Sequence, residues 1–194
     1  MAGAPVDRLI MRTAAMVFRR WLVGIRGLEH IELGGDPFLF VANHNQRIEA
    51  PMLPTFLLFG RQGIPVRFVA DWPMKIVPGF ARCYRIGRMI TVTRKDARPR
   101  WLNIFRPLFD EKVPAFDRAL AALCAGDSVG VFPEGTINRH PTRLLRGRTG
   151  AARLALMAGV PVVPAGIRFP EHDGETLIPD SARLSIDIDP QTFF

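Results

Sequence analysis

The sequence is poor in cysteine: Cys83 and Cys124 are the only two, and they lie too far apart to form a C-x-x-C pair. This scarcity excludes a disulfide framework and a cysteine-based zinc site, and it favours a reducing, cytoplasmic compartment. No run of about 18 apolar residues occurs, so no membrane-spanning helix is expected. The amino terminus also lacks the basic-then-apolar order and the cleavage site of a signal peptide.

Lysine and tyrosine are rare as well. The 194 residues include one Tyr and three Lys, so Arg supplies most of the 26 basic residues and of the net charge of +8. Such a charge attracts nucleic acid, acidic lipid headgroups or phosphorylated substrates, although a compositional bias of the source genome would produce it too. A nucleic-acid binder finds no further support, because the sequence has no aromatic RNA-binding strand motif, zinc finger or helix-turn-helix motif.

Apolar residues make up 48% of the chain and charged residues 23%, which is the balance of a folded domain. Short β-like runs fall at 38–41, 66–69, 89–92, 129–132, 162–165 and 184–188. Helical stretches lie between them at 50–59, 113–124 and 149–158. This alternation predicts an α/β fold, a single domain with a mostly parallel or mixed central sheet flanked by helices.

An amphipathic helix is expected before this domain, from about Pro5 to Gly24. Its apolar and basic residues fall on different faces: Val6, Ile10, Val17 and Trp21 against Arg8, Arg12 and Arg19. Such a helix can lie in the headgroup layer of an anionic membrane or pack on its own domain. The sequence therefore divides into an N-terminal amphipathic helix, residues 1–26, and a domain of residues 27–194.

Polar residues follow the first predicted strand of the domain, at a place where α/β domains gather active-site residues. His44 comes after this strand, and Glu49 follows five positions later. A carboxylate on one imidazole nitrogen fixes the tautomer and makes the other nitrogen a better base. On a continuous helix the two would point about 140° apart, so they can meet only across a turn that leads into a helix. The pair predicts a general base, and incidental proximity is the alternative.

Three further segments follow or form predicted strands. Arg94 lies at the end of the strand predicted at 89–92, two residues past the apolar run. There it can hold a phosphate through two nitrogens or form a surface ion pair. The segment Phe132-Pro133-Glu134-Gly135-Thr136 forms a rigid turn that can aim a side chain into a cleft. The segment 160–164, Val-Pro-Val-Val-Pro, reads most simply as a core strand.

Taken in order, these four segments resemble the four motifs of the lysophospholipid and glycerol-phosphate acyltransferases, and the resemblance extends from about Gly27 to Pro170. It implies an α/β domain with an apolar groove for an acyl chain and a role in phospholipid biosynthesis. It implies that His44 is the general base and that Glu49 orients it. The implied donor is an acyl thioester of coenzyme A or acyl carrier protein, the implied acceptor is the hydroxyl of a lysolipid, and no metal or cofactor is needed.

The resemblance also implies a binding site for the acceptor. Arg94 would bind its anionic oxygens, and the third motif would shape the site through Glu134, Gly135, Thr136 and Arg139. Arg139 enters this prediction as a substitute, because Ile137 stands where the family commonly has Arg.

Two other departures fall in the first motif, where Glu49 replaces the usual Asp and Gln46 replaces a frequent Ser. Ile137 leaves open an acyltransferase for a lyso-aminolipid, such as lyso-ornithine lipid, and Glu49 and Ile137 together leave open a non-catalytic lipid-binding relic of the same fold. A serine hydrolase is disfavoured, since no G-x-S-x-G motif is present.

The stretch between Arg94 and Val113 is long for a simple connection. Its large apolar residues recur at helical spacing, interrupted by Pro107: Trp101, Ile104, Phe105, Leu108 and Phe109. We expect a lid over the acyl groove or a second membrane contact, the alternative being a further helix that covers the core. Together with the basic helix at the amino terminus, this predicts a peripheral protein on an anionic membrane surface, at its cytoplasmic face.

Overall fold

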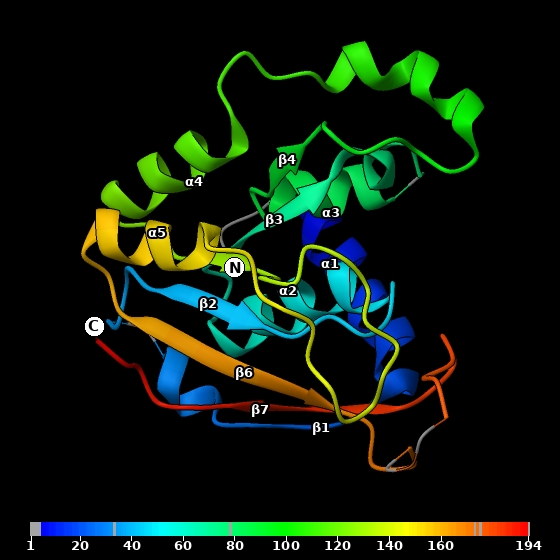
Figure 1. Cartoon of the computed structure of the whole chain (residues 1–194), viewed down its shortest axis with the longest axis vertical. Helices are drawn as coiled ribbons and strands as arrows, with labels where there is room; N and C mark the ends of the chain where they lie inside the picture. Colours follow the sequence, from blue (N-terminus) through cyan, green and yellow to red (C-terminus); the bar gives the residue numbers. More distant parts are fainter. Residues whose placement is uncertain (1–4, 33, 78, 173, 175, 194) are drawn as a thin grey trace.

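The computed structural model describes residues 5–32, 34–77, 79–172, 174 and 176–193. Its strands form one seven-stranded sheet in the order β1-β7-β6-β2-β5-β3-β4 (Figure 1). The strands are β1 Leu22–Arg26, β2 Leu39–Ala42, β3 Arg67–Asp71, β4 Ile90–Val92, β5 Val129–Val131, β6 Val162–Arg168 and β7 Leu184–Ile188. Neighbouring strands are parallel except β6 and β7, which are antiparallel. The predicted α/β domain with a mostly parallel, mixed sheet is confirmed.

Helices cover both faces of this sheet. The α-helices are α1 Pro5–Phe18, α2 Glu49–Gly60, α3 Phe80–Ile86, α4 Ala115–Cys124 and α5 Gly150–Ala158. Short 3-10 segments are η1 Arg19–Trp21, η2 Leu28–Ile31, η3 Trp72–Ile76 and η4 Arg100–Phe109. Helices α4 and α5 lie side by side (Figure 1). Helices α1, α2 and α3 form a second group, in which each contacts the other two.

Alternation along β2 places side chains in both layers of the core. Phe40 belongs to a buried cluster that contains Leu53 and Leu57 of α2. Leu39, the neighbouring residue, belongs to a second buried cluster with Leu123 of α4 and Leu154 of α5. Because both faces of β2 are covered, its sequence reads as a continuous apolar run, which is why the strand could be predicted.

The N-terminal helix is shorter than the sequence predicted. It ends at Phe18, and the residues expected to continue it to Gly24 form η1 and then β1, which pairs in parallel with β7. Burial also differs from the expected face: Met11 packs with Leu58 of α2 and Cys83 of α3, whereas Val17 is exposed. Helix α1 therefore packs on its own domain, with residues 1–4 of the predicted segment 1–26 outside the described residues.

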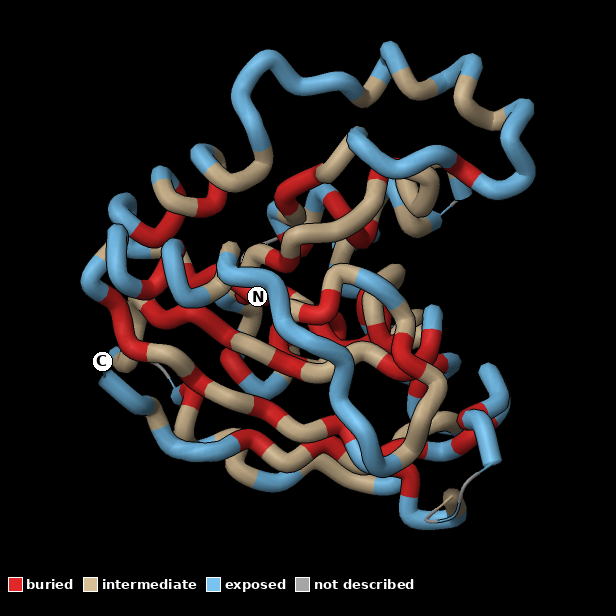
Figure 2. The backbone as a smooth tube through the Cα atoms, in the orientation of Figure 1, coloured by how far each residue is buried: buried red, intermediate tan, exposed pale blue. Residues whose placement is uncertain are grey.

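The segment between β4 and α4 stands out from the rest of the fold. It contains η4, which has no buried residue and forms the exposed upper arm of the molecule (Figure 2). Its C-terminal end is attached through Phe109, whose ring lies 5.8 Å from that of the buried Trp72. This segment therefore does not form a helix that covers the core, which was one of the alternatives expected from the sequence.

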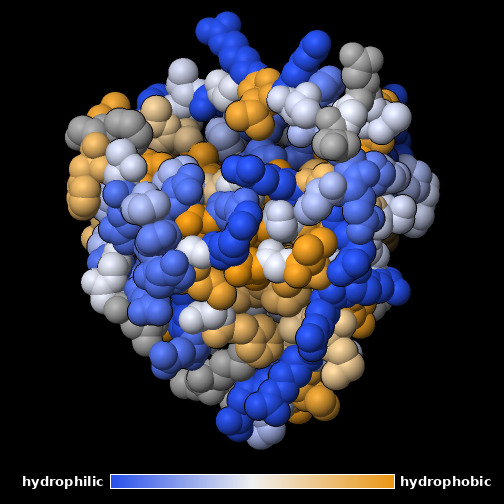
Figure 3. All heavy atoms as spheres, turned by 90° about the horizontal axis from the view of Figure 1, so that it is seen from below, coloured by the Kyte–Doolittle hydropathy of each residue, from blue (hydrophilic) through white to orange (hydrophobic). Residues whose placement is uncertain are grey.

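Two features concern the surface. The described part of the chain has no helix with both the length and the apolar character to cross a bilayer. On the face seen from below, apolar residues gather near the centre, between hydrophilic residues that cover much of the rest of this face (Figure 3).

Candidate active site

The turn between β2 and α2 brings His44 and Glu49 together. The chain leaves the sheet at Ala42 and enters α2 at Glu49, so the two side chains meet across the turn and not along a helix. His44 Nδ1 lies 2.8 Å from Glu49 Oε2. The same carboxylate oxygen accepts a hydrogen bond of 2.7 Å from the backbone N–H of Asn45. The longer side chain of Glu, compared with Asp, therefore reaches the imidazole.

Glu49 is fully buried, and this burial raises the pKa of its carboxyl above the usual value. The hydrogen bond from His44 and the backbone N–H donors act in the opposite direction, since they favour the carboxylate. Glu49 Oε1 has no hydrogen-bond partner among the described residues. With Nδ1 of His44 directed at Glu49, Nε2 is the nitrogen left to take a proton from a substrate.

The imidazole is held from a second direction by Phe132. The two rings stack, with centroids 4.3 Å apart and planes inclined by 21°. The backbone of the same residue is fixed as well, because His44 C=O accepts a hydrogen bond of 2.7 Å from the N–H of Asn138. A histidine held on its ring and on its backbone needs little reorganisation to accept a proton.

Glu134 is buried and serves the backbone of the site. Its Oε1 accepts the N–H of His44 at 3.4 Å, and its Oε2 accepts the N–H of Leu145 at 3.0 Å. The carboxylate thus joins the turn that carries His44 to the loop between β5 and α5. It does not line the cavity beside His44, so its contacts are those of a positioning residue.

That cavity has a volume of about 520 Å³ and lies between β3, α4 and α5. Its wall includes apolar side chains such as Val69, Phe116 and Leu154, and His44 lies at its edge. A volume of this size is typical of small-molecule sites. Three cationic side chains also line it: Arg47, Lys95 and Arg148.

The other residues predicted to bind substrate are placed differently from one another. Gly135 lines the cavity, and its carbonyl accepts a hydrogen bond of 2.7 Å from Lys95 Nζ. Thr136 is exposed and does not line it. Arg139 does not line it either, because its guanidinium is bonded to both carboxylate oxygens of Asp180, each at 2.8 Å.

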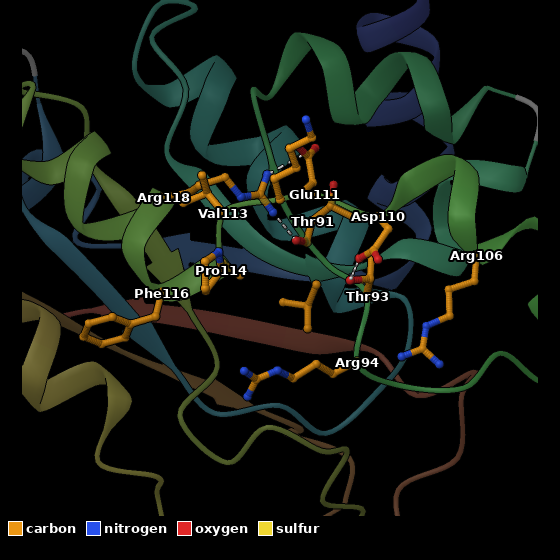
Figure 4. Close-up of a pocket in the computed structure, with 13 residues that line it drawn as sticks. Thr91, Thr93, Arg94, Arg106, Asp110, Glu111, Val113, Pro114, Phe116 and Arg118 are labelled. Carbon is orange, nitrogen blue, oxygen red and sulfur yellow. Dashed lines mark hydrogen bonds and ion pairs between the residues drawn. The ribbon is translucent and has the colours of Figure 1, made fainter.

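Arg94 lines a second cavity of about 370 Å³, between β4, η4 and α4 (Figure 4). The walls of this cavity are tied by Thr93 to Asp110, at 2.9 Å, and by Arg118 to Glu111, at 3.3 Å. Arg94 itself makes no hydrogen bond or ion pair within the described chain. The two cavities adjoin, since Phe116 lines both.

The four motifs and this geometry agree with a comparison against protein families, in which the model of the acyltransferase family matches residues 22–168. The chain belongs to the acyltransferase family. The match begins at the first residue of β1 and ends at the last residue of β6.

Individual acyltransferases show the same relationship. The chain is 26% identical over 140 residues to the chloroplastic 1-acyl-sn-glycerol-3-phosphate acyltransferase BAT2 of Brassica napus, covering 72% of this chain and 35% of that protein. It is 25% identical over 148 residues to the chloroplastic 1-acyl-sn-glycerol-3-phosphate acyltransferase LPAT1 of Arabidopsis thaliana, covering 76% and 36%. The chain thus spans about a third of the length of these relatives.

A solved structure shows the same fold. The 1-acyl-sn-glycerophosphate acyltransferase PlsC of Thermotoga maritima superposes with a TM-score of 0.63, at 22% identity, over 97% of this chain and 69% of that one. At this level of identity the similarity shows a shared fold, and it extends over nearly the whole chain.

Three cavity residues of this acyltransferase escaped the sequence prediction. Arg47 lies within the first motif, between His44 and Glu49, and Lys95 directly follows Arg94, so their neighbours were a signal for both. Arg148 belongs to none of the four motifs, and its place at the cavity follows only from the return of the loop between β5 and α5.

Proposed function

We propose that this protein transfers a fatty acyl group from an acyl thioester to the hydroxyl of a lysophospholipid-type acceptor, such as 1-acyl-glycerol-3-phosphate, with His44 as general base. The observation that carries the proposal is the contact of 2.8 Å between His44 Nδ1 and the buried Glu49, beside a cavity of about 520 Å³. The relatives named as 1-acyl-sn-glycerol-3-phosphate acyltransferases support the class of acceptor.

The reaction follows from the position of the base. As the acceptor oxygen attacks the thioester carbonyl carbon, its proton passes to Nε2 of His44. The tetrahedral intermediate then collapses, the carbon–sulfur bond breaks, and the imidazolium returns the proton to the leaving thiolate. Glu49 holds the ring and stabilises its positive charge between these steps. General-base catalysis typically contributes about 10² to 10⁴-fold, and positioning of the two substrates supplies much of the rest.

The donor in this proposal is a thioester of coenzyme A or of acyl carrier protein. No metal or cofactor enters the mechanism, because the imidazole and carboxylate supply the proton transfers. The acyl chain would lie along the apolar wall that includes Val69 and Leu154.

We place the protein at the cytoplasmic face of a membrane, as a peripheral protein on an anionic surface. Support comes from η4, on which large apolar side chains are exposed: Trp101 at 67%, Ile104 at 77% and Leu108 at 76%. Exposed basic residues accompany them, among them Arg98 and Arg100. An apolar helix face flanked by Arg suits a headgroup layer.

The test is acyl transfer by the purified protein, with labelled palmitoyl-coenzyme A and a panel of lysolipids that includes lyso-ornithine lipid. We expect product with the native chain and a loss of about 10² to 10⁴-fold for His44→Ala. The same panel is repeated with palmitoyl-acyl carrier protein. Absence of product with both donors would overturn the proposal and leave the non-catalytic relic.

The contact between His44 and Glu49 argues against the non-catalytic relic. A relic has no need of a carboxylate buried against His44, yet Glu49 is fully buried and bonded to it. Glu49→Asp tests the point directly: a working enzyme changes its rate modestly, whereas activity that appears only with Asp identifies the native chain as the relic.

A further inference from the structure

Three cations line the cavity beside His44, and two of them are available to a ligand. Lys95 is engaged, since its Nζ lies 2.7 Å from Gly135 O and 3.2 Å from Asp71 Oδ2. The side chains of Arg47 and Arg148 have no hydrogen bond or ion pair among the described residues, and both are exposed at the cavity. We propose that Arg47 and Arg148 together bind the phosphate monoester of the acceptor. This inference rests on the proposed function, whose acceptor it specifies.

The arginines expected from the motifs are placed less well for this role. Arg139 is held by both oxygens of Asp180 and by the carbonyl of Ile178 at 2.8 Å, away from the cavity. Arg94 lines only the neighbouring cavity, under η4. The positive charge beside His44 that has no partner within the described residues therefore comes from Arg47 and Arg148.

Arg47 is tied to the base by its position in the chain. It lies in the turn between β2 and α2, three residues after His44 and two before Glu49. In 1-acyl-glycerol-3-phosphate the free hydroxyl and the phosphate are on neighbouring carbon atoms. A phosphate bound by a residue of this turn thus leaves the hydroxyl close to the base.

Arg148 is positioned by Gly135 and by the backbone. Its N–H donates a hydrogen bond of 2.8 Å to the carbonyl of Pro133, which closes the loop that leads into α5. Its side chain passes over Gly135, where an added Cβ would lie only 2.9 Å from Arg148 Nε. Gly135 also has a φ of +64°, a conformation in which side chains are strained. The glycine of the third motif therefore makes room for this guanidinium.

Two guanidiniums are suited to a doubly charged phosphate monoester, because each can donate a pair of hydrogen bonds to its oxygens. An acyl donor on coenzyme A also carries phosphates, so the same chemistry has a second source. Separate kinetic constants for acceptor and donor distinguish the two sources.

The kinetic experiment compares Arg47→Gln and Arg148→Gln with Arg146→Gln, which removes the same charge two residues away and outside the cavity. We expect KM for lysophosphatidate to rise about 10- to 100-fold in each of the first two, as for a lost hydrogen bond to a charged group. KM for palmitoyl-coenzyme A, and KM for the phosphate-free acceptor 1-acylglycerol, should change less than about twofold. A rise in the donor KM instead, or an equal effect of Arg146→Gln, would overturn the inference.

A binding experiment separates this inference from the proposed reaction. Glycerol 3-phosphate is titrated into His44→Ala and into the double variants that add Arg148→Gln or Arg146→Gln, with heat or amide chemical shifts as the readout. We expect affinity to fall at least about tenfold with Arg148→Gln and to stay unchanged with Arg146→Gln. If affinity falls as expected but the native chain transfers no acyl group, the anion site stands and the proposed function fails. No binding by His44→Ala, or equal binding by both double variants, means that the anion site is absent.

Discussion

At the residue scale, the carboxylate of Glu49 combines burial with only one bonded oxygen. Its Oε2 accepts both His44 Nδ1 and the N–H of Asn45, while Oε1 has no partner among the described residues. Burial raises the pKa of this carboxyl, so the folded state favours the protonated form relative to the unfolded chain. The contribution of Glu49 to stability is therefore largest below its unfolded pKa and is lost as the pH rises through its folded pKa.

The first prediction concerns Glu49→Gln. The amide oxygen can take the place of Oε2 and accept the N–H groups of both His44 Nδ1 and Asn45, but it carries no negative charge to stabilise the imidazolium, so His44 becomes a weaker base. Activity should fall by about 10² to 10⁴-fold. Thermal stability at pH 7 should equal or exceed that of the native protein, because a buried charge is gone. This advantage should narrow as the pH falls through the raised pKa of Glu49 toward about 4, where the carboxyl is protonated in the unfolded chain as well.

The measurement is the melting temperature of both proteins across pH 3 to 8, beside the rate of acyl transfer. A variant that is less stable than the native protein at pH 7 but not at pH 4 would show that the ionised carboxylate stabilises the fold. Glu134→Gln is the comparison, since that carboxylate bonds two backbone N–H groups and does not contact the ring of His44.

A second prediction concerns Asp187, whose contribution to stability depends on pH in the direction opposite to that of Glu49. The hydrogen bond from Arg26, at 2.6 Å, lowers the pKa of the Asp187 carboxyl, and Arg168 acts in the same direction. Its stabilising effect is present above the unfolded pKa and is lost as the pH falls through the folded pKa. Because both arginines are mostly exposed, Asp187→Asn should cost no more than about 1 kcal/mol at pH 7.

Urea unfolding of Asp187→Asn at pH 7 and at about pH 2.5 tests whether the stabilisation by Asp187 is lost at low pH. The difference from the native protein should shrink at the lower pH, because the pH there approaches the lowered pKa of the Asp187 carboxyl. Asp189→Asn is the matched control, as its side chain makes no hydrogen bond or ion pair in the described chain. A loss that persists unchanged at low pH would assign the effect to packing.

The site shows which residue roles a sequence reveals. His44 and Glu49 are close in the chain, so their meeting across a turn could be predicted from local spacing. Arg139 was expected at the acceptor, but its partner Asp180 lies 41 residues later and could not be identified from the motif. Arg148 lines the cavity only because its loop folds back on Pro133. Side-chain direction depends on such distant contacts, which leave no local pattern.

At the element scale, strand β1 depends on Gly27, the residue after its last member Arg26. Gly27 has a φ of +77°, and a Cβ there would lie 1.9 Å from the carbonyl oxygen of Ile188 at the end of β7. The backbone atom that it would meet belongs to a strand and cannot move aside cheaply. The close approach of β7 thus requires glycine at this position.

Gly27→Ala should therefore destabilise the protein by about 1–3 kcal/mol through overpacking, with about 1–2 kcal/mol more from the left-handed backbone. Gly24→Ala, in the same strand, is the control, because an added Cβ meets nothing within 4 Å. Denaturant midpoints of the two variants test the prediction. Equal midpoints would mean that β1 contributes little to the stability of the sheet.

Strand β1 also marks the limit of sequence prediction at this scale. Buried central strands such as β2 are apolar on both faces and could be recognised. Strand β1 lies at the edge of the sheet and carries Arg26 and an exposed Val23, so it resembled the end of an amphipathic helix. Only its pairing with β7, far along the chain, makes it a strand.

A prediction for η4 follows from its exposure. None of its residues is buried, so Trp101→Ser with Leu108→Ser should leave thermal stability unchanged. Transfer of an apolar side chain out of water provides about 1.5–3 kcal/mol, so loss of these two should weaken vesicle binding by at least about tenfold. Phe109 is left in place because it packs on Trp72. Leu177→Ser, equally exposed on another loop, is the control in vesicle co-sedimentation, and unchanged binding by the η4 variant would remove this contact.

At the scale of the whole molecule, the charge of +8 and the apolar face of η4 act on a membrane in different ways. Each Arg near an anionic surface adds about 1 kcal/mol of attraction, which salt screens because the Debye length falls from about 10 Å at 0.1 M to about 3 Å at 1 M. Apolar contact is not screened. The two contributions can therefore be separated by varying salt and lipid independently.

We expect affinity for anionic vesicles to fall by at least about tenfold between 0.05 M and 0.5 M salt, since several charges act together. The weaker affinity for uncharged phosphatidylcholine vesicles should not fall with salt, and Trp101→Ser with Leu108→Ser should abolish it. Co-sedimentation with both kinds of vesicle measures this. If anionic binding survives high salt in the η4 variant, another apolar surface holds the protein, and the face seen from below, where apolar side chains lie between hydrophilic ones (Figure 3), becomes the one to alter.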